Sequence, residues 1–192
     1  MITRQDILDT PTFSQRRAEW RQQILALKKN RRVALGSEVT LYFENRDTLL
    51  WQIQEMLYIE KGGEEQIDDE LAAYAPLEPN GKELVATVMI EIADPLIRAQ
   101  KLAHLGHFEF SLIMRFGEHT LQGVPEDDMD RTTEQGKTSS VHFIRWLFTP
   151  QQVTDFQQPD IDIIIECTHP QYKEKTILSS AVHKDLKVDF RL

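Results

Sequence analysis

Residues 137–148, KTSSVHFIRWLF, are the segment that most restricts the fold of this chain. Side chains of a strand point alternately to its two faces. One face then carries Ser140, His142, Ile144, Trp146 and Phe148, and the other carries Val141, Phe143, Arg145 and Leu147. Both faces are mostly apolar, so we expect a central strand. The fold must therefore place a layer of structure against each face of this strand.

The rest of the pattern predicts an α+β fold. Strand patterns occupy residues 39–44, 83–93, 107–116, 119–124, 161–170, 175–180 and 186–192. Helical patterns occupy residues 13–30, 46–60, 94–106 and 150–157, and a short acidic helix precedes the turn at Asn80. An acidic loop follows residue 124. Because the later strands have short connections, we expect a largely antiparallel sheet with helices packed on it and an N-terminal helical segment.

Length and charge suggest one domain with a basic N-terminal segment. The chain has 192 residues, and we expect residues 1–192 to form a single domain. Residues 1–32 contain eight Lys or Arg and three acidic residues, a net charge of +5; the whole chain carries −9, so the remainder carries −14. The basic segment could pack on its own acidic body or on a second copy. Alternatively, Arg16, Arg17, Arg31 and Arg32 could bind nucleic acid or phosphate.

Several classes of protein are not expected. No apolar run reaches the roughly 18–20 residues of a membrane span, and residues 1–11 lack the apolar core of a secretory signal. We therefore expect a cytoplasmic protein. The one cysteine, Cys167, cannot form an intrachain disulfide, and one thiol cannot hold a four-cysteine iron–sulfur cluster.

The predicted helix at residues 46–60 carries polar residues in an apolar setting. Gln52, Gln54 and Glu55 lie in its middle, and Glu55 has apolar neighbours one turn away on each side. A desolvated carboxylate needs a cation, donors, a metal or a proton. Two interpretations remain open: a structural ion pair with Arg46 or Arg145, or a metal ligand or general base.

Two histidines suggest where such a metal could bind. In residues 161–170, His169 shares a face with Cys167 and three isoleucines. If this strand pairs antiparallel with residues 137–148, His142 and His169 lie close together. Glu55, His142 and His169 would then bind a divalent metal, with Glu44, Arg46, Gln52 and Arg145 as surrounding polar groups. The alternative is that both histidines are hydrogen-bonded structural residues.

The chain also resembles a known family. The blocks RRVALG and VTLYFENRDTLLWQIQEM within residues 31–56, KTSSVHFIRW at 137–146 and HPQY at 169–172 are similar to those of an uncharacterised bacterial family, a domain of unknown function. The resemblance implies no activity and no catalytic residues. It implies that similar proteins are often encoded beside rubrerythrin-like proteins and heterodisulfide-reductase-like iron–sulfur proteins.

Three functions follow as hypotheses, and whether the chain is an enzyme stays open. The first is a non-catalytic accessory or binding module whose partner is a redox or peroxide-defence protein, or a second copy of the chain. The second is a small metal-binding protein or metal-dependent enzyme that uses Glu55, His142 and His169. The third is the nucleic-acid or phosphate binder described above, which the overall acidity disfavours.

Overall fold

Two antiparallel sheets form the body of the protein in the computed structural model, which describes residues 1–126 and 131–190. The first sheet has the order β1-β2-β3-β7-β6, with β1 (Arg32–Leu35), β2 (Val39–Glu44), β3 (Glu83–Ile90), β7 (Val141–Leu147) and β6 (Val124–Pro125). The second has the order β5-β4-β8-β9, with β5 (His119–Gln122), β4 (Leu112–Phe116), β8 (Ile163–His169) and β9 (Tyr172–Ile177). The α+β class and the antiparallel pairing are confirmed.

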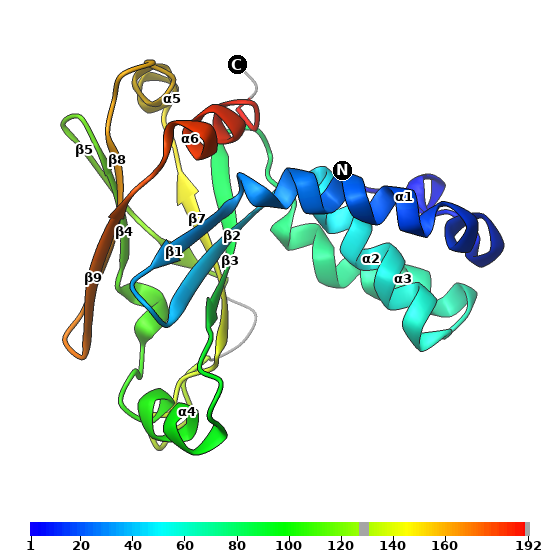
Figure 1. Cartoon of the computed structure of the whole chain (residues 1–192), viewed down its shortest axis with the longest axis horizontal. Coiled ribbons are helices and arrows are strands. Elements are labelled where there is room, and N and C mark those ends of the chain that lie inside the picture. Colours follow the sequence, from blue (N-terminus) through cyan, green and yellow to red (C-terminus); the bar gives the residue numbers. More distant parts are fainter. Residues whose placement is uncertain (127–130, 191–192) are drawn as a thin grey trace.

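The two sheets face each other (Figure 1), and the main core lies between them. Leu41 and Trp146 from the first sheet and Met114 and Ile165 from the second are fully buried there. The expectation for β7 is confirmed: it pairs with β3 on one side and β6 on the other. Its Trp146 face points into this core, while Phe143 on the opposite face packs on a second apolar cluster.

Three helices form an arm beside the sheets (Figure 1): α1 (Thr10–Lys29), α2 (Arg46–Glu60) and α3 (Glu64–Tyr74). Leu49 of α2 packs with Val85 of β3, so α2 seats the arm on the outer face of the first sheet. An aromatic cluster joins α1 to α2: Phe13, Trp20, Trp51 and Tyr58 have ring centroids 5.5–5.7 Å apart in four pairs. Short 3-10 helices η1 (Arg4–Asp6) and η2 (Ala75–Leu77) flank the arm.

Three further helices cover the ends of the sheets (Figure 1). α4 (Pro95–Leu102) lies at one end, with η3 (Phe108–Phe110) following it, and α5 (Pro150–Phe156) and α6 (Ser180–Lys187) lie at the other. Each of these helices has a side chain that caps its N-terminus. Asp94, Thr149 and Ser179 accept hydrogen bonds from backbone N–H groups in the first turns of α4, α5 and α6. No helix in the described ranges is long and apolar enough to cross a membrane.

Several expected elements were wrong or shifted. The strand expected at residues 186–192 is instead the end of α6 and a turn, and residues 191–192 lie outside the described part. The helix is favoured because Val182, His183 and Leu186 bury one helical face. Residues 108–110 form η3 rather than strand, and α1 starts at Thr10, after its cap Asp9, rather than at residue 13. The expected acidic loop includes residues 127–130, which are also outside the described part.

Candidate functional site

The three polar residues in the middle of α2 each hold a different segment of the chain. Gln52 donates to the carboxylate of Glu44 at 3.1 Å. Gln54 accepts from the backbone N–H of Leu8 at 2.9 Å and donates to the carbonyl of Leu8 at 3.0 Å. Glu55 receives two hydrogen bonds from Arg17 of α1. The polar residues therefore attach β2, the N-terminal segment and α1 to one helix.

The expected partners of Glu55 were wrong. Arg46 pairs with Asp6 at 2.5 Å, and Arg145 pairs with Glu83 at 3.2 Å across the first sheet. Arg145 also donates to the carbonyl of Pro76 at 2.7 Å. Glu55 does form an ion pair with an arginine, but the arginine is Arg17 of α1. The sequence did not indicate this partner because the packing of α1 on α2 brings together residues that are 38 apart in sequence.

Glu44 is a buried carboxylate that neutral donors surround. Thr48 donates to it at 2.5 Å, Gln52 at 3.1 Å and Thr87 at 2.8 Å. Three donors satisfy much of the hydrogen-bonding capacity that water would otherwise supply. Glu44 and Gln52, two of the expected pocket residues, are thus brought together, but as a junction between β2, β3 and α2.

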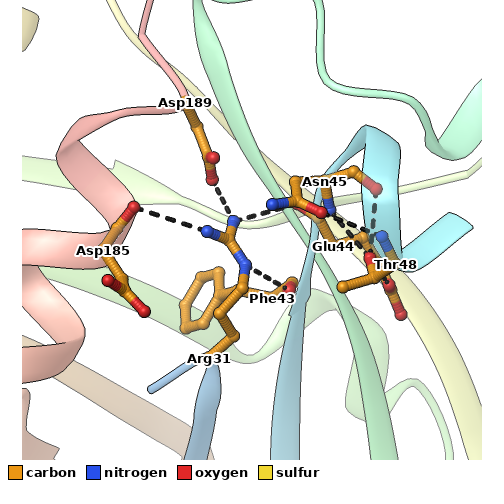
Figure 2. A network of polar contacts seen from close by, with 7 residues as sticks. All are labelled: Arg31, Phe43, Glu44, Asn45, Thr48, Asp185 and Asp189. Carbon is orange, nitrogen blue, oxygen red and sulfur yellow. Dashed lines mark hydrogen bonds and ion pairs between the residues drawn. The ribbon is translucent and has the colours of Figure 1, made fainter. Parts of the chain in front are cut away.

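Arg31 is the centre of a second buried network, which Figure 2 shows. Its side chain forms an ion pair with Asp189 and donates to the carbonyls of Phe43 at 3.0 Å, Glu44 at 3.3 Å and Asp185 at 3.4 Å. Arg31 is 1% exposed. This residue therefore ties α6 and the segment after it to β2, a role that its place in a basic run of sequence did not indicate.

The four arginines proposed for nucleic-acid binding do not form a joint surface. Arg31 is inaccessible, Arg17 is paired with Glu55, and Arg32 lies 3.6 Å from Glu91 with its guanidinium over the ring of Tyr42. Arg16 is exposed. The geometry gives this hypothesis no support from the residues that suggested it.

The expected pairing of the two histidine strands was wrong. β7 carries His142 in the first sheet, and β8 carries His169 in the second, since α5 takes the chain from one sheet to the other. The histidines nevertheless approach one buried residue from both sheets. The ring of Phe108 lies 5.4 Å from that of His142 and 6.5 Å from that of His169.

Glu109, which the sequence reasoning overlooked, is the charged neighbour of His142. Its Oε2 lies 3.6 Å from Nδ1 of His142, and neither atom has a hydrogen-bond partner among residues 1–126 and 131–190. Both side chains are almost fully buried. Burial lowers the pKa of His142, although Glu109 and the Ser139 carbonyl oppose this effect and Arg131 adds to it. A carboxylate flanked by two phenylalanines in the sequence FEF was the available signal.

Glu109 and Thr138 lie at the two nitrogens of the His142 ring, which is the spatial arrangement of an acid–imidazole–hydroxyl catalytic triad. Nε2 of His142 lies 3.4 Å from Oγ1 of Thr138, but it lies 2.9 Å from the carbonyl of Ser139. A carbonyl only accepts, so Nε2 carries the hydrogen and has no lone pair to take a proton from Thr138. Thr138 is also 2% exposed. This arrangement therefore fits a structural role better than nucleophilic catalysis.

The proposed metal ligands are not assembled in the described residues. Both oxygens of Glu55 bind Arg17 on the arm. Nε2 of His169 contacts the carbonyl of Gly106 at 3.2 Å, and its Nδ1 accepts from the N–H of Gln171 at 3.2 Å. Within residues 1–126 and 131–190, no group of three or more His, Cys, Asp or Glu side chains could hold a metal ion.

Comparison with known proteins identifies the family. The model of the family described as "Protein of unknown function (DUF3501)" matches residues 1–190. The chain belongs to the DUF3501 family. Among solved structures, a novel protein of unknown function from Burkholderia pseudomallei K96243 is similar: it is 31% identical, with a TM-score of 0.91 over 99% of each chain. Among curated proteins there is no significant match.

In this DUF3501 member, α4 presents an apolar stripe to solvent. Leu96 and Ala99 of α4 and its C-cap residue Ala103 follow the i, i+3, i+7 spacing of one helical face and are all exposed. Leu96 is 76% exposed and the neighbouring Ile97 is 48% exposed. Only Leu102 of this helix is buried. An apolar helical face normally packs on a core, so the stripe is a candidate interaction surface.

Proposed function

We propose that this DUF3501 protein is a non-catalytic binding module that contacts a partner protein through the α4 stripe, defined as Leu96, Ala99 and Ala103 with Ile97. The observation that carries the proposal is the exposure of Leu96, which is 76% exposed in a helix that buries only Leu102. Contiguous exposed apolar residues are a common feature of protein interaction sites.

The condition of the polar residues supports a non-catalytic role. Glu55, Arg46 and Arg145 have ion-pair partners within the fold, and Gln52 is bonded to Glu44. Catalytic groups are more often found in a cleft with strongly shifted pKa values and open positions for a substrate. These side chains are better explained as connections between segments.

The family resemblance suggests the kind of partner, a redox protein such as a di-iron or iron–sulfur protein. In this chain the thiol of Cys167 is buried, and burial raises its pKa. A buried thiol with few thiolate anions is a poor redox nucleophile. In this proposal the redox centre therefore belongs to the partner, and the two proteins meet in the cytoplasm.

Site-specific crosslinking can test the α4 stripe. A photoreactive residue would replace Leu96 in one variant and Leu25 in another, and each would be irradiated in the native host. Leu25 is a matched control because it is a leucine on the surface of α1, 59% exposed and on the distant arm (Figure 1). The proposal expects one redox protein to be captured at position 96 and not at position 25.

Binding of the captured protein would then be measured with purified components by calorimetry. Leu96→Glu should raise Kd by at least about tenfold, equivalent to about 1.4 kcal/mol, while Leu25→Glu should change it less than about twofold. Equal effects of both substitutions would remove α4 from the proposal. Capture of a second copy of this chain, or of a protein without a redox centre, would contradict the redox partner.

A further inference from the structure

A cleft of about 520 Å³ opens beside the C-terminal half of α4. Three segments form its walls: the β1–β2 turn with Ser37 and Glu38, the end of α4 and the residues after it, and the start of β9 with Tyr172 and Glu174. Sites for small molecules in proteins have volumes of roughly 300–1,000 Å³. The cleft is therefore large enough for a compact ligand.

Contacts between the walls fix the shape of the cleft. The hydroxyl of Tyr172 donates to the carbonyl of Leu35 at 2.5 Å and accepts from the N–H of Glu38 at 3.4 Å. Lys101 of α4 forms an ion pair with Glu38 across the cleft. Gly36 adopts φ of +69°, and a Cβ on it would lie 2.6 Å from the Tyr172 hydroxyl. The β1–β2 turn is thus held against β9 and α4.

Several polar groups in the cleft are uncommitted. The side chains of Ser37, Gln100, Gln171 and Glu174 make no hydrogen bond or ion pair within residues 1–126 and 131–190. Nδ1 of His104 lies 2.7 Å from the carbonyl of Gln100, so Nδ1 carries the hydrogen and Nε2 of the neutral ring keeps its lone pair. The cleft therefore offers two amides, one hydroxyl, one imidazole acceptor and one carboxylate to a ligand.

The charge balance selects the ligand. Lys101 neutralises Glu38, so the remaining charge in the cleft is the carboxylate of Glu174. A carboxylate and an imidazole lone pair favour a donor with positive charge and disfavour an anion. The ring of Tyr172, which is half-buried, adds apolar surface for a short hydrocarbon chain.

We propose that this cleft binds a small aliphatic amine, with the ammonium group on the Glu174 carboxylate and a neutral hydrogen-bonding end on the amides of Gln100 and Gln171. The ammonium donates a charge-assisted hydrogen bond, which is about twice as strong as a neutral one. The proposal concerns a small molecule and does not depend on the partner protein.

Three probes with the same four-carbon skeleton test the charge preference: 4-amino-1-butanol, 1,4-butanediol and 4-hydroxybutyrate. Each would be titrated into the full chain, and backbone amide shifts would be followed by NMR. The amine should shift the amides of Ser37, Gln100, Gln171 and Glu174. The diol should bind at least about fivefold more weakly, since it lacks the charge-assisted bond, and the anion should cause no saturable shift.

Glu174→Gln removes the charge and keeps the size of the side chain. It should weaken binding of 4-amino-1-butanol at least about threefold, because Glu174 is exposed and solvent reduces the strength of an exposed charge pair. Glu118→Gln, in the exposed turn after β4, is the matched control and should leave Kd unchanged. Thermal unfolding of both variants would confirm that they fold.

Three results would overturn the proposal. One is equal binding of the amine and the anion. Another is an unchanged Kd in Glu174→Gln. The third is amine-induced shifts spread over exposed carboxylates such as Glu118 to the same extent as in the cleft. Leu96→Glu should leave amine binding unchanged, so failure of the α4 stripe and failure of the cleft are separate outcomes.

Discussion

Arg17 of α1 and Glu55 of α2 form a two-pronged ion pair. Nε of Arg17 donates to Oε1 of Glu55 at 2.7 Å, and Nη2 donates to Oε2 at 2.8 Å. The guanidinium also lies 5.0 Å from the ring centroid of Tyr58. The pair closes the polar edge of the aromatic cluster that joins α1 to α2, so the arm depends on both apolar and charged contacts.

Arg17→Ala should therefore lower the free energy of unfolding by about 1 kcal/mol. Hydrogen bonds between charged groups contribute about 1.5–3 kcal/mol, but these side chains are 34% and 18% exposed, and solvent reduces the value. Urea unfolding measures the change. Arg21→Ala is the control because Arg21 is an exposed cation on the same helix. The difference between the two variants should narrow in 1 M NaCl, where charges are screened; an unchanged difference would mean that packing on Tyr58 dominates.

Gln54→Ala should release the N-terminal segment from α2. The side-chain amide satisfies both the N–H and the carbonyl of Leu8 and is 2% exposed, so its loss should cost about 1–3 kcal/mol. Amide hydrogen exchange at Leu8 should become faster, while exchange in β7 stays slow. Gln23→Ala, an exposed amide on α1, provides the comparison. Unchanged protection at Leu8 would contradict the role of Gln54.

Short-range sequence patterns predicted the helices and strands that depend mainly on neighbouring residues. The expected bounds of α2, residues 46–60, agree with the structure because helical periodicity is a short-range pattern, and Asn45 caps the helix by accepting from the N–H of Thr48. The two apolar faces of residues 137–148 indicated a strand with neighbours on both sides, and β7 is one. The helix at residues 180–187 was missed although Ser179 caps it, because its short pattern also fits a strand.

Contacts between residues far apart in sequence could not be predicted from such short-range patterns. Glu55 and Arg17 are 38 residues apart, and Arg31 and Asp189 are 158 apart. No spacing rule links such pairs, since the sheet order decides them. The register assumed for His142 and His169 failed because the short connection through α5 joins two sheets rather than two neighbouring strands. The sequence therefore indicated which groups needed partners, and the topology supplied them.

Arg31→Ala should be more damaging than any other arginine substitution considered above. It would remove a guanidinium that is 1% exposed, pairs with Asp189 and donates to the carbonyls of Phe43 and Glu44; breaking a buried ion pair in this way typically costs about 3–5 kcal/mol. Chemical denaturation measures the loss, and hydrogen exchange in α6 should become faster. Arg32→Ala, which removes a 59% exposed cation next in sequence, should cost less than about 1 kcal/mol.

The double variant Arg31→Met with Asp189→Leu distinguishes two explanations for that loss. It removes both charges and keeps apolar volume, so it should recover most of the stability lost in Arg31→Ala. If the double variant is as unstable as the single one, the hydrogen bonds of Arg31 to the carbonyls of Phe43 and Glu44 matter more than the charge pair.

Acid should destabilise the protein through two buried histidines. Burial lowers the pKa of His142 and of His183, whose Nε2 contacts the carbonyl of Phe156 at 2.6 Å. A histidine with a lowered pKa binds fewer protons in the folded state than in the unfolded state. As pH falls below the unfolded value of about 6.5, stability should therefore fall by up to about 1.4 kcal/mol per pH unit for each histidine.

The test is the slope of unfolding free energy between pH 7.5 and pH 5.5, measured in urea. His142→Gln keeps a side-chain N–H for the Ser139 carbonyl but cannot titrate, so its slope should be smaller than that of the parent chain. His104→Gln, at an exposed position, is the control for replacing a histidine by glutamine. The slope is informative even if His142→Gln is less stable at every pH. If the slope of unfolding free energy against pH is the same in His142→Gln as in the parent chain, His142 does not contribute to the acid sensitivity. Glu109 would then offset the effect of burial and of Arg131 on the pKa of His142.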